Sequence, residues 1–149
     1  MPFATGRSRT LPFHVEPVNG EALDSWLEAI ALRHDAPFGA VLRRCGIHAL
    51  TLRDGWMIRP QRADIARLAD VTGVEPSVLG DMTLARYIGA VNLGRGGGRP
   101  RPSAWGWRAA SRLCPECLAD TDGRWQIAWR LNWTFACVKH RRLLADVCP

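Results

Sequence analysis

The chain has 149 residues, of which 47% are hydrophobic and 23% are charged, a balance typical of soluble globular proteins and not of disordered ones. Basic residues outnumber acidic ones by 20 to 14, which gives a net charge of +6, and every basic residue except Lys139 is arginine. Arginine suits phosphate recognition, so nucleic acid is a candidate partner, although a GC-rich genome would also favour arginine. No apolar stretch approaches the ~20 residues of a membrane span and no signal peptide opens the chain, so we expect a cytoplasmic protein with no membrane anchor.

An extended lead over residues 1–18 precedes the first predicted helix. After Asn19, apolar residues recur at helical spacing and form one stripe. Asn19 is the expected N-cap, and Glu21 and Asp24 put negative charge near the positive end of the helix. The stripe consists of Leu23, Trp26, Leu27, Ile30 and Ala31.

The second predicted helix begins at Pro37, a favoured first-turn residue, and ends at Gly46. Cys45 falls on its apolar face, which favours a small core residue over a metal ligand. Residues 47–60 then show no clear periodicity. The other members of the apolar face are Phe38, Val41 and Leu42.

Two further helices are predicted, over about 61–72 and 76–82, with Gly73 between them. This succession of helix, glycine turn and helix over 61–82 is the outline of a helix-turn-helix, whose second helix can enter a DNA major groove. Here the second helix lacks a basic face and carries Asp81. We therefore favour packing or protein docking over base reading for this unit.

Several arginines lie beside this unit or in the segment after it. Residues 19–92 are expected to form a helical domain, and residues 93–109 a basic linker rich in glycine and proline. Phosphate contacts from such residues would be independent of sequence and sensitive to salt. The candidates are Arg62, Arg67, Arg86, Arg95, Arg99 and Arg101.

The most specific pattern is a pair of short metal-ligand motifs near the carboxyl end. Cys114 and Cys117 form one, Cys137 and His140 the other, and 19 residues separate them. Zinc prefers four sulfur and nitrogen ligands, and a complete Cys₃His set leaves no position for water, so the ion would be structural and not catalytic. An odd cysteine count and a reducing compartment argue against disulfides. Cys148 is an alternative to His140, but the two-residue loop favours His140.

The segment between the two motifs is rich in tryptophan and predicts a short helix over about 124–131, then a strand in WTFACV. A unit of roughly 40 residues cannot bury enough apolar surface to fold alone, so the metal must contribute. Stripping the metal is expected to unfold this unit while the helical part persists. The predicted fold is mainly α: a small helical domain with a helix-turn-helix-like unit, then a zinc-knuckle or zinc-ribbon-like α+β module over 110–149.

Three stretches resemble proteins of the TniQ family, which act in DNA transposition. LPFHVEPVNGEALDSWLEAIALRHDAP resembles the opening of the family, and LADVTGVEPSVLGDMTLARY resembles a later helical segment. RLCPECLADTDGRWQIAWRLNWTFACVKHRRLLADVCP is similar to the zinc-binding signature of the family and is the most specific of the three. The resemblance covers nearly the whole chain from Leu11 onward.

The resemblance implies a non-enzymatic adaptor. Such proteins help to select a target site by linking a DNA-bound or RNA-guided targeting complex to an AAA+ ATPase, which recruits the transposase. By resemblance, the helix pair over 61–82 would be a recruitment or nucleic-acid-contacting surface, and the four metal ligands would be Cys114, Cys117, Cys137 and His140. The alternative is a stand-alone, sequence-specific DNA-binding regulator with a structural zinc module.

One departure from the family concerns the end of the chain. Many relatives continue past a Cys-Pro pair into a second zinc motif, whereas Cys148-Pro149 has no partner here, so we expect a short member or an N-terminal fragment with one zinc ion. No enzyme is expected, because the glycine run at 94–98 lacks the lysine and Ser/Thr of a phosphate-binding loop. A zinc hydrolase would need a vacant ligand position.

Overall fold

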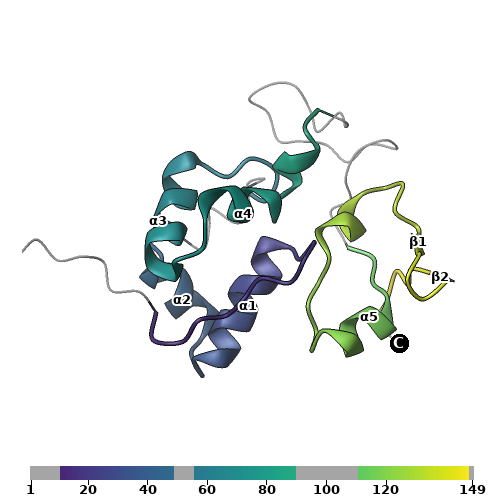
Figure 1. Ribbon diagram of the computed structural model, residues 1–149, viewed down its shortest axis with the longest axis horizontal. Helices are drawn as coiled ribbons and strands as arrows, with labels where there is room; N and C mark the ends of the chain where they lie inside the picture. The colour runs from purple at the N-terminus through teal and green to yellow at the C-terminus, as the bar shows by residue number, and fades with distance from the viewer. Residues whose placement is uncertain (1–10, 49–55, 90–110, 148–149) are drawn as a thin grey trace, which may run out of the picture.

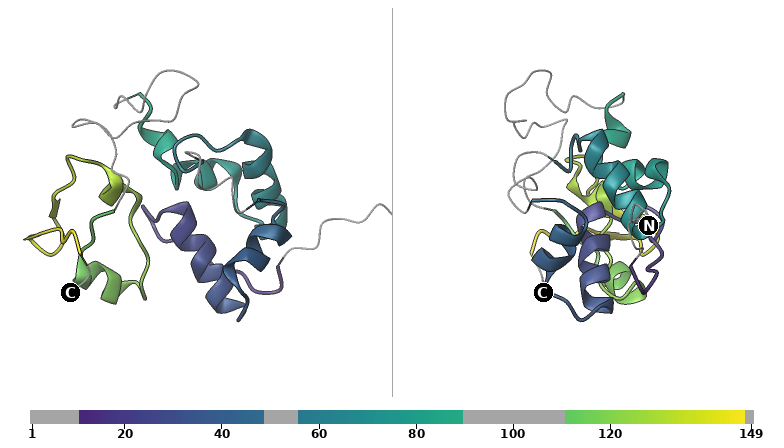
Figure 2. Two further views of the ribbon diagram at one scale, coloured as in Figure 1. Left: turned by 180° about the vertical axis from the view of Figure 1, so that it is seen from behind. Right: turned by 90° about the vertical axis from the view of Figure 1, so that its left-hand side faces the viewer.

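The computed structural model describes residues 11–48, 56–89 and 111–147, and within them the protein is mainly helical (Figure 1). Four α-helices and one 3₁₀ helix form the amino-terminal part: α1 (Leu23–Arg33), α2 (Phe38–Arg44), α3 (Arg62–Thr72), α4 (Pro76–Asp81) and η2 (Leu84–Tyr87). The carboxyl-terminal part contains α5 (Pro115–Asp120), η3 (Ile127–Arg130), and the strands β1 (Ala136–Cys137) and β2 (Arg142–Leu143). Figure 2 shows the two parts side by side, in contact through α1.

Helix α1 is the centre of the amino-terminal core. All five residues of its predicted apolar stripe are buried, and the Trp26 indole Nε1 donates a 2.9 Å hydrogen bond to the Val15 carbonyl. The predicted N-cap is wrong, because Ala22 precedes the helix and no side chain caps it. Asn19 lies in a turn that Gly20 closes at φ +77°, and Glu21 pairs with Gln126 in an isolated β-bridge.

Glycines end two of the helices, as the sequence predicts. Gly46 follows α2 at φ +68°, and Gly73 caps α3 in the left-handed conformation at φ +76°, which costs glycine least. Cys45 is buried in the core, as the sequence predicts, and burial raises the pKa of its thiol to about 11.

The segment without clear periodicity contributes unexpectedly to the core. Trp56, Met57 and Ile58 are all buried, and the Trp56 indole Nε1 donates to Asp64 Oδ2 at 2.8 Å. The Leu84 backbone N–H donates to the Met57 carbonyl at 2.8 Å. Irregular backbone gives these residues no repeating pattern, so periodicity cannot reveal their burial.

The two parts share hydrophobic surface. Ile127 and Leu131 belong to the carboxyl-terminal part, yet both are buried in the larger cluster that α1–α4 build. A smaller cluster of buried residues surrounds the cysteines and includes Trp129 and Leu144. The predicted domain boundaries at 92 and 110 lie outside the residues that the structure describes, so they stay a prediction.

The predicted helix over 124–131 is wrong, because only the single 3₁₀ turn η3 forms there. Backbone groups that a helix would use internally are bonded across to the start of α1 instead. The Ala22 N–H donates to the Trp125 carbonyl at 2.8 Å, and the Ile127 N–H donates to the Gly20 carbonyl at 2.9 Å. Trp125 and Trp129 pack edge to face in one small cluster, with ring centres 5.8 Å apart, whereas Trp133 is exposed, so the regular spacing of the tryptophans does not mark one helical face.

A buried ion pair joins the two parts. Glu21 is fully buried, and Arg124 Nη1 contacts its two carboxylate oxygens at 2.9 and 2.8 Å. The Val18 N–H and the Ser25 hydroxyl donate to the same carboxylate, each at 3.0 Å. The charge is thus neutralised and its oxygens are hydrogen-bonded, as a buried carboxylate requires.

No helix in the described ranges combines the length and the apolar character that crossing a bilayer requires.

Replacing Arg124 with glutamine should destabilise the protein by about 3–5 kcal/mol, because the buried Glu21 carboxylate loses its counter-charge. The matched control is Arg142→Gln, which removes an exposed pair with Glu116 and should cost far less, because water and salt screen an exposed pair. Urea unfolding followed by circular dichroism measures both. Equal losses for the two variants would contradict the role assigned to Glu21 and Arg124.

Candidate metal centre

Three cysteines and one histidine come together in the carboxyl-terminal part. Their ligand atoms all lie within 4.8 Å of one another, although the residues come from two separate segments. Cys114 immediately precedes α5 and Cys117 lies in its first turn, while Cys137 ends β1 and His140 lies in the turn before β2.

The distances among these atoms fit one tetrahedral ion. His140 Nδ1 lies 3.4, 3.3 and 3.5 Å from the sulfurs of Cys114, Cys117 and Cys137, and the last two sulfurs are 3.5 Å apart. Ordinary zinc bond lengths in a tetrahedron would give separations of about 3.6–3.8 Å. The four side chains can therefore hold a metal ion with only a small outward adjustment.

Helix α5 positions the first two sulfurs. Pro115 stands at its first position, and the Leu118 N–H donates to the Cys114 carbonyl at 3.1 Å, which starts the helix at the ligand itself. Three residues apart on one helical turn, Cys114 and Cys117 face the same side. The sequence predicted a short loop here and did not predict that the loop continues into a helix as far as Asp120.

A β-hairpin positions the other two ligands. Strands β1 and β2 are antiparallel, with Cys137 opposite Arg142, so the intervening turn carries His140. Arg141 adopts φ +50° in this turn, and the His140 backbone N–H lies 3.4 Å from Cys137 Sγ. The strand predicted in WTFACV is present as β1, but it and its partner β2 are each only two residues long.

The local environment treats the three thiols differently. Burial raises the pKa of Cys114 and raises the pKa of Cys117 to about 12. Burial opposes ionisation of Cys137 as well, but hydrogen bonds outweigh it, led by the one from the His140 N–H, and its pKa falls to about 7. Three close thiolates repel one another, so a bound cation would supply the charge that holds them together.

An acidic side chain outside the four ligands orients the histidine. Asp120 Oδ2 lies 3.1 Å from His140 Nε2, while Nδ1 faces the sulfurs. Lys139 Nζ contacts the same carboxylate oxygen, and its hydrogen bond to Asp120 lowers the pKa of that carboxyl. A proton on Nε2, donated to Asp120, leaves the Nδ1 lone pair free to coordinate a metal. Sequence reasoning missed Asp120, although it lies three residues after Cys117 on the same helix.

The remaining two cysteines are Cys45 and Cys148. Cys45 is buried in the amino-terminal core, away from the four ligands. Cys148, the predicted alternative to His140, lies outside the described residues, so the preference for His140 stays a prediction.

The candidate phosphate contacts differ in their surroundings. Arg67 Nη1 lies 3.3 Å from Asp64 Oδ1 and also donates to the Gly46 carbonyl. Arg86 donates to the Asp81 carbonyl, and its guanidinium carbon lies 5.4 Å from the centre of the Tyr87 ring. Arg62 is exposed at the first position of α3. Arg95, Arg99 and Arg101 lie outside the described residues.

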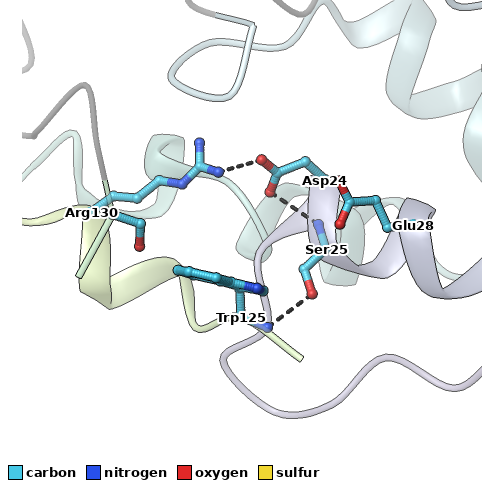
Figure 3. A pocket seen from close by; sticks show the side chains of 6 residues that line it. Asp24, Ser25, Glu28, Trp125 and Arg130 are labelled. Atoms are coloured by element: carbon cyan, nitrogen blue, oxygen red, sulfur yellow. Dashed lines mark hydrogen bonds and ion pairs between the residues drawn. The ribbon is translucent and has the colours of Figure 1, made fainter. Parts of the chain in front are cut away.

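A polar pocket of about 290 Å³ lies where the two parts meet, and sequence reasoning did not predict it (Figure 3). Arg130 pairs with Asp24 across it, and Trp125 lies below them. Partial burial and the neighbouring Asp24 raise the pKa of Glu28, against the opposing effect of Arg130. The Ser25 hydroxyl is already used, because it donates to Glu21 and accepts the Trp125 N–H at 2.9 Å. The residues that line this pocket therefore bond the two parts to each other.

Chelation of the metal should lower the melting temperature of the whole chain and not only unfold residues 111–147. The helical part would lose the buried Ile127 and Leu131 and the Arg124 partner of Glu21. This differs from the sequence-based expectation that the helical part would persist. Circular dichroism melts with and without EDTA, followed by re-addition of Zn²⁺, measure the effect. An unchanged helical transition in the metal-free protein would contradict it.

Asp120→Asn should weaken metal affinity by about 10–100-fold, because the histidine loses the carboxylate that fixes its ring. Asp122→Asn is the matched control: its residue has φ +51°, which asparagine tolerates, and the change removes the same charge nearby. Titration with Co²⁺, followed by visible absorption, gives both affinities. Equal affinities for the two variants would exclude the assigned role of Asp120.

A family model described as TniQ matches residues 12–144, a span that includes α1–α4 and all four clustered ligands. No match is found among curated proteins. The match covers most of the chain, and this protein belongs to the TniQ family.

Proposed function

We propose that this protein is a non-enzymatic adaptor of DNA transposition. It would help to select the target site by linking a DNA-bound or RNA-guided targeting complex to an AAA+ ATPase, which in turn recruits the transposase. The observation that carries this proposal is the TniQ match over residues 12–144. The match supports a transposition-associated protein, and the adaptor role is the function that a small binding protein of this kind would perform.

We further propose that the metal is one structural Zn²⁺ ion. Three thiolates and an imidazole form a donor set that zinc prefers, and Cys114, Cys117, Cys137 and His140 supply four ligands without a vacant position. The ion would stabilise the small carboxyl-terminal part. A zinc hydrolase is a poorer candidate, because it keeps one position for water or substrate.

Contact with DNA is proposed to be weak and largely independent of sequence. Helix α4 carries no basic residue and ends at Asp81, so it offers little to a DNA backbone or to base edges. Arg67 and Arg86 already donate to groups of the protein. The helix pair α3–α4, whose outline is that of a helix-turn-helix, is therefore proposed as a protein-docking unit.

The adaptor proposal predicts that the zinc-loaded chain retains an AAA+ ATPase of a transposition system on immobilised DNA. Binding of the chain alone to random duplex DNA should be weak and should fall by roughly tenfold or more between 50 and 200 mM salt, as phosphate contacts require. A pull-down with the ATPase, present and absent, and a filter-binding salt series measure the two quantities.

The same experiment tests the alternative of a stand-alone regulator. A regulator should protect one sequence in a footprint, with a preference of at least roughly 10³-fold over random DNA. Such a footprint without ATPase association would contradict the adaptor proposal. A cobalt spectrum with fewer than three thiolate ligands would contradict the structural zinc site separately.

A further inference from the structure

A largely apolar groove of about 470 Å³ lies between α3, α4 and η2, on a face that the metal centre does not use. Its lining differs from the polar pocket between the two parts, because most of its side chains are aliphatic or small. The residues that shape it are Ile65, Ala66, Pro76, Gly80, Ala85 and Ile88.

Small residues make the groove deep enough to admit side chains of another protein. A Cβ atom added at Gly80 would meet no atom within 4 Å, so the groove is open above this part of α4. Ala66 and Ala85 add only a methyl group each to the walls. Ile88 is 46% exposed at the rim, which leaves an apolar side chain in contact with water. Covering such surface is favourable by the hydrophobic effect.

One end of the groove is positively charged. Arg59 and Arg62 both line it, and Arg62 is exposed, with no hydrogen bond or ion pair to any other residue that the structure describes. Arg62 is also the first residue of α3. An acidic side chain is the natural complement at this end.

We propose that this groove binds a peptide segment of a partner protein that presents one or two large apolar side chains next to Asp or Glu. The apolar side chains would lie along Ile65 and Gly80, and the carboxylate would pair with Arg62. The proposal goes beyond the adaptor function by naming a surface and its ligand chemistry. It rests on that function only in assigning the partner to the transposition machinery.

Other occupants fit the groove less well. Residues 93–109 of this chain contain four arginines and no acidic residue, so the exposed Arg62 would repel them. A DNA backbone offers phosphates and sugars, which gain little from aliphatic walls. An apolar peptide with an acidic flank satisfies the walls and the charged end together.

Phage display of random dodecapeptides on the zinc-loaded full chain tests the proposal. Selection should enrich sequences that combine large apolar residues with Asp or Glu. The affinity of a synthetic copy of the most enriched peptide is then measured by fluorescence anisotropy. Gly80→Leu and Ala66→Gln add bulk from opposite walls of the groove, and Arg62→Glu reverses the charge at its end. Circular dichroism melts establish that each variant is folded.

We expect each of these three variants to weaken peptide binding by about tenfold or more. Arg43→Glu is the matched control: it makes the same charge change at an exposed position of α2 outside the groove, and should alter affinity less than about twofold. Failure to enrich any peptide would overturn the proposal, as would enriched peptides without acidic residues. If a 20-bp DNA duplex displaces the peptide from the wild-type chain and does not bind the Gly80→Leu variant, the groove is a DNA site and the proposal fails.

The outcome for the groove is separable from the outcome for the adaptor function. Peptide binding reports the groove alone, whereas the ATPase pull-down reports association through any surface. If Gly80→Leu loses the peptide but the wild-type chain retains no ATPase, the groove stands and the adaptor role fails. If ATPase retention is found but no peptide is enriched, the adaptor role stands and the groove proposal fails.

Discussion

The buried pair of Glu21 and Arg124 is the contact on which the arrangement of this protein depends. The two residues are 103 positions apart, and they bring the turn before α1 against the loop that follows α5. Around them the backbone forms two further hydrogen bonds, from Ala22 to Trp125 and from Ile127 to Gly20. A buried carboxylate without its counter-charge is costly, so the amino-terminal part is complete only when the carboxyl-terminal part lies against it.

A metal ion held by the four clustered ligands and this contact would stabilise each other. Helix α5 carries Cys117, and only a few residues of the chain separate this ligand from Arg124. Trp129 belongs to the small cluster around the cysteines, whereas Ile127 and Leu131 on either side of it are buried in the larger core. A few residues of η3 thus connect the two clusters. A metal ion that orders the cysteines would also hold these apolar side chains in place.

Local patterns in the sequence predicted the parts of the fold that depend on neighbouring residues. The apolar stripe of α1, the glycine after α3 and the two-residue spacing within each ligand motif all rest on contacts within a few positions. The contribution of Trp56 could not be predicted, because irregular backbone has no period. Glu21 was interpreted as a charge near a helix end, since its partner Arg124 is remote in sequence. The tryptophan-rich segment looked helical for the same reason: its backbone bonds to α1, which no local pattern records.

The arginine content has a different meaning once the partners are known. Arg124 neutralises Glu21, Arg130 pairs with Asp24, and Arg112 donates to the carbonyls of Asn132 and Thr134 at 3.1 and 3.0 Å. These arginines hold loops and parts together, and their charge is no longer available to phosphates. Because each paired acidic residue cancels one arginine, the count of 19 arginines overstates the attraction of the described surface for DNA. What that surface offers instead is an apolar groove with an exposed Arg62 at one end, a combination that suits a protein ligand better than a nucleic acid.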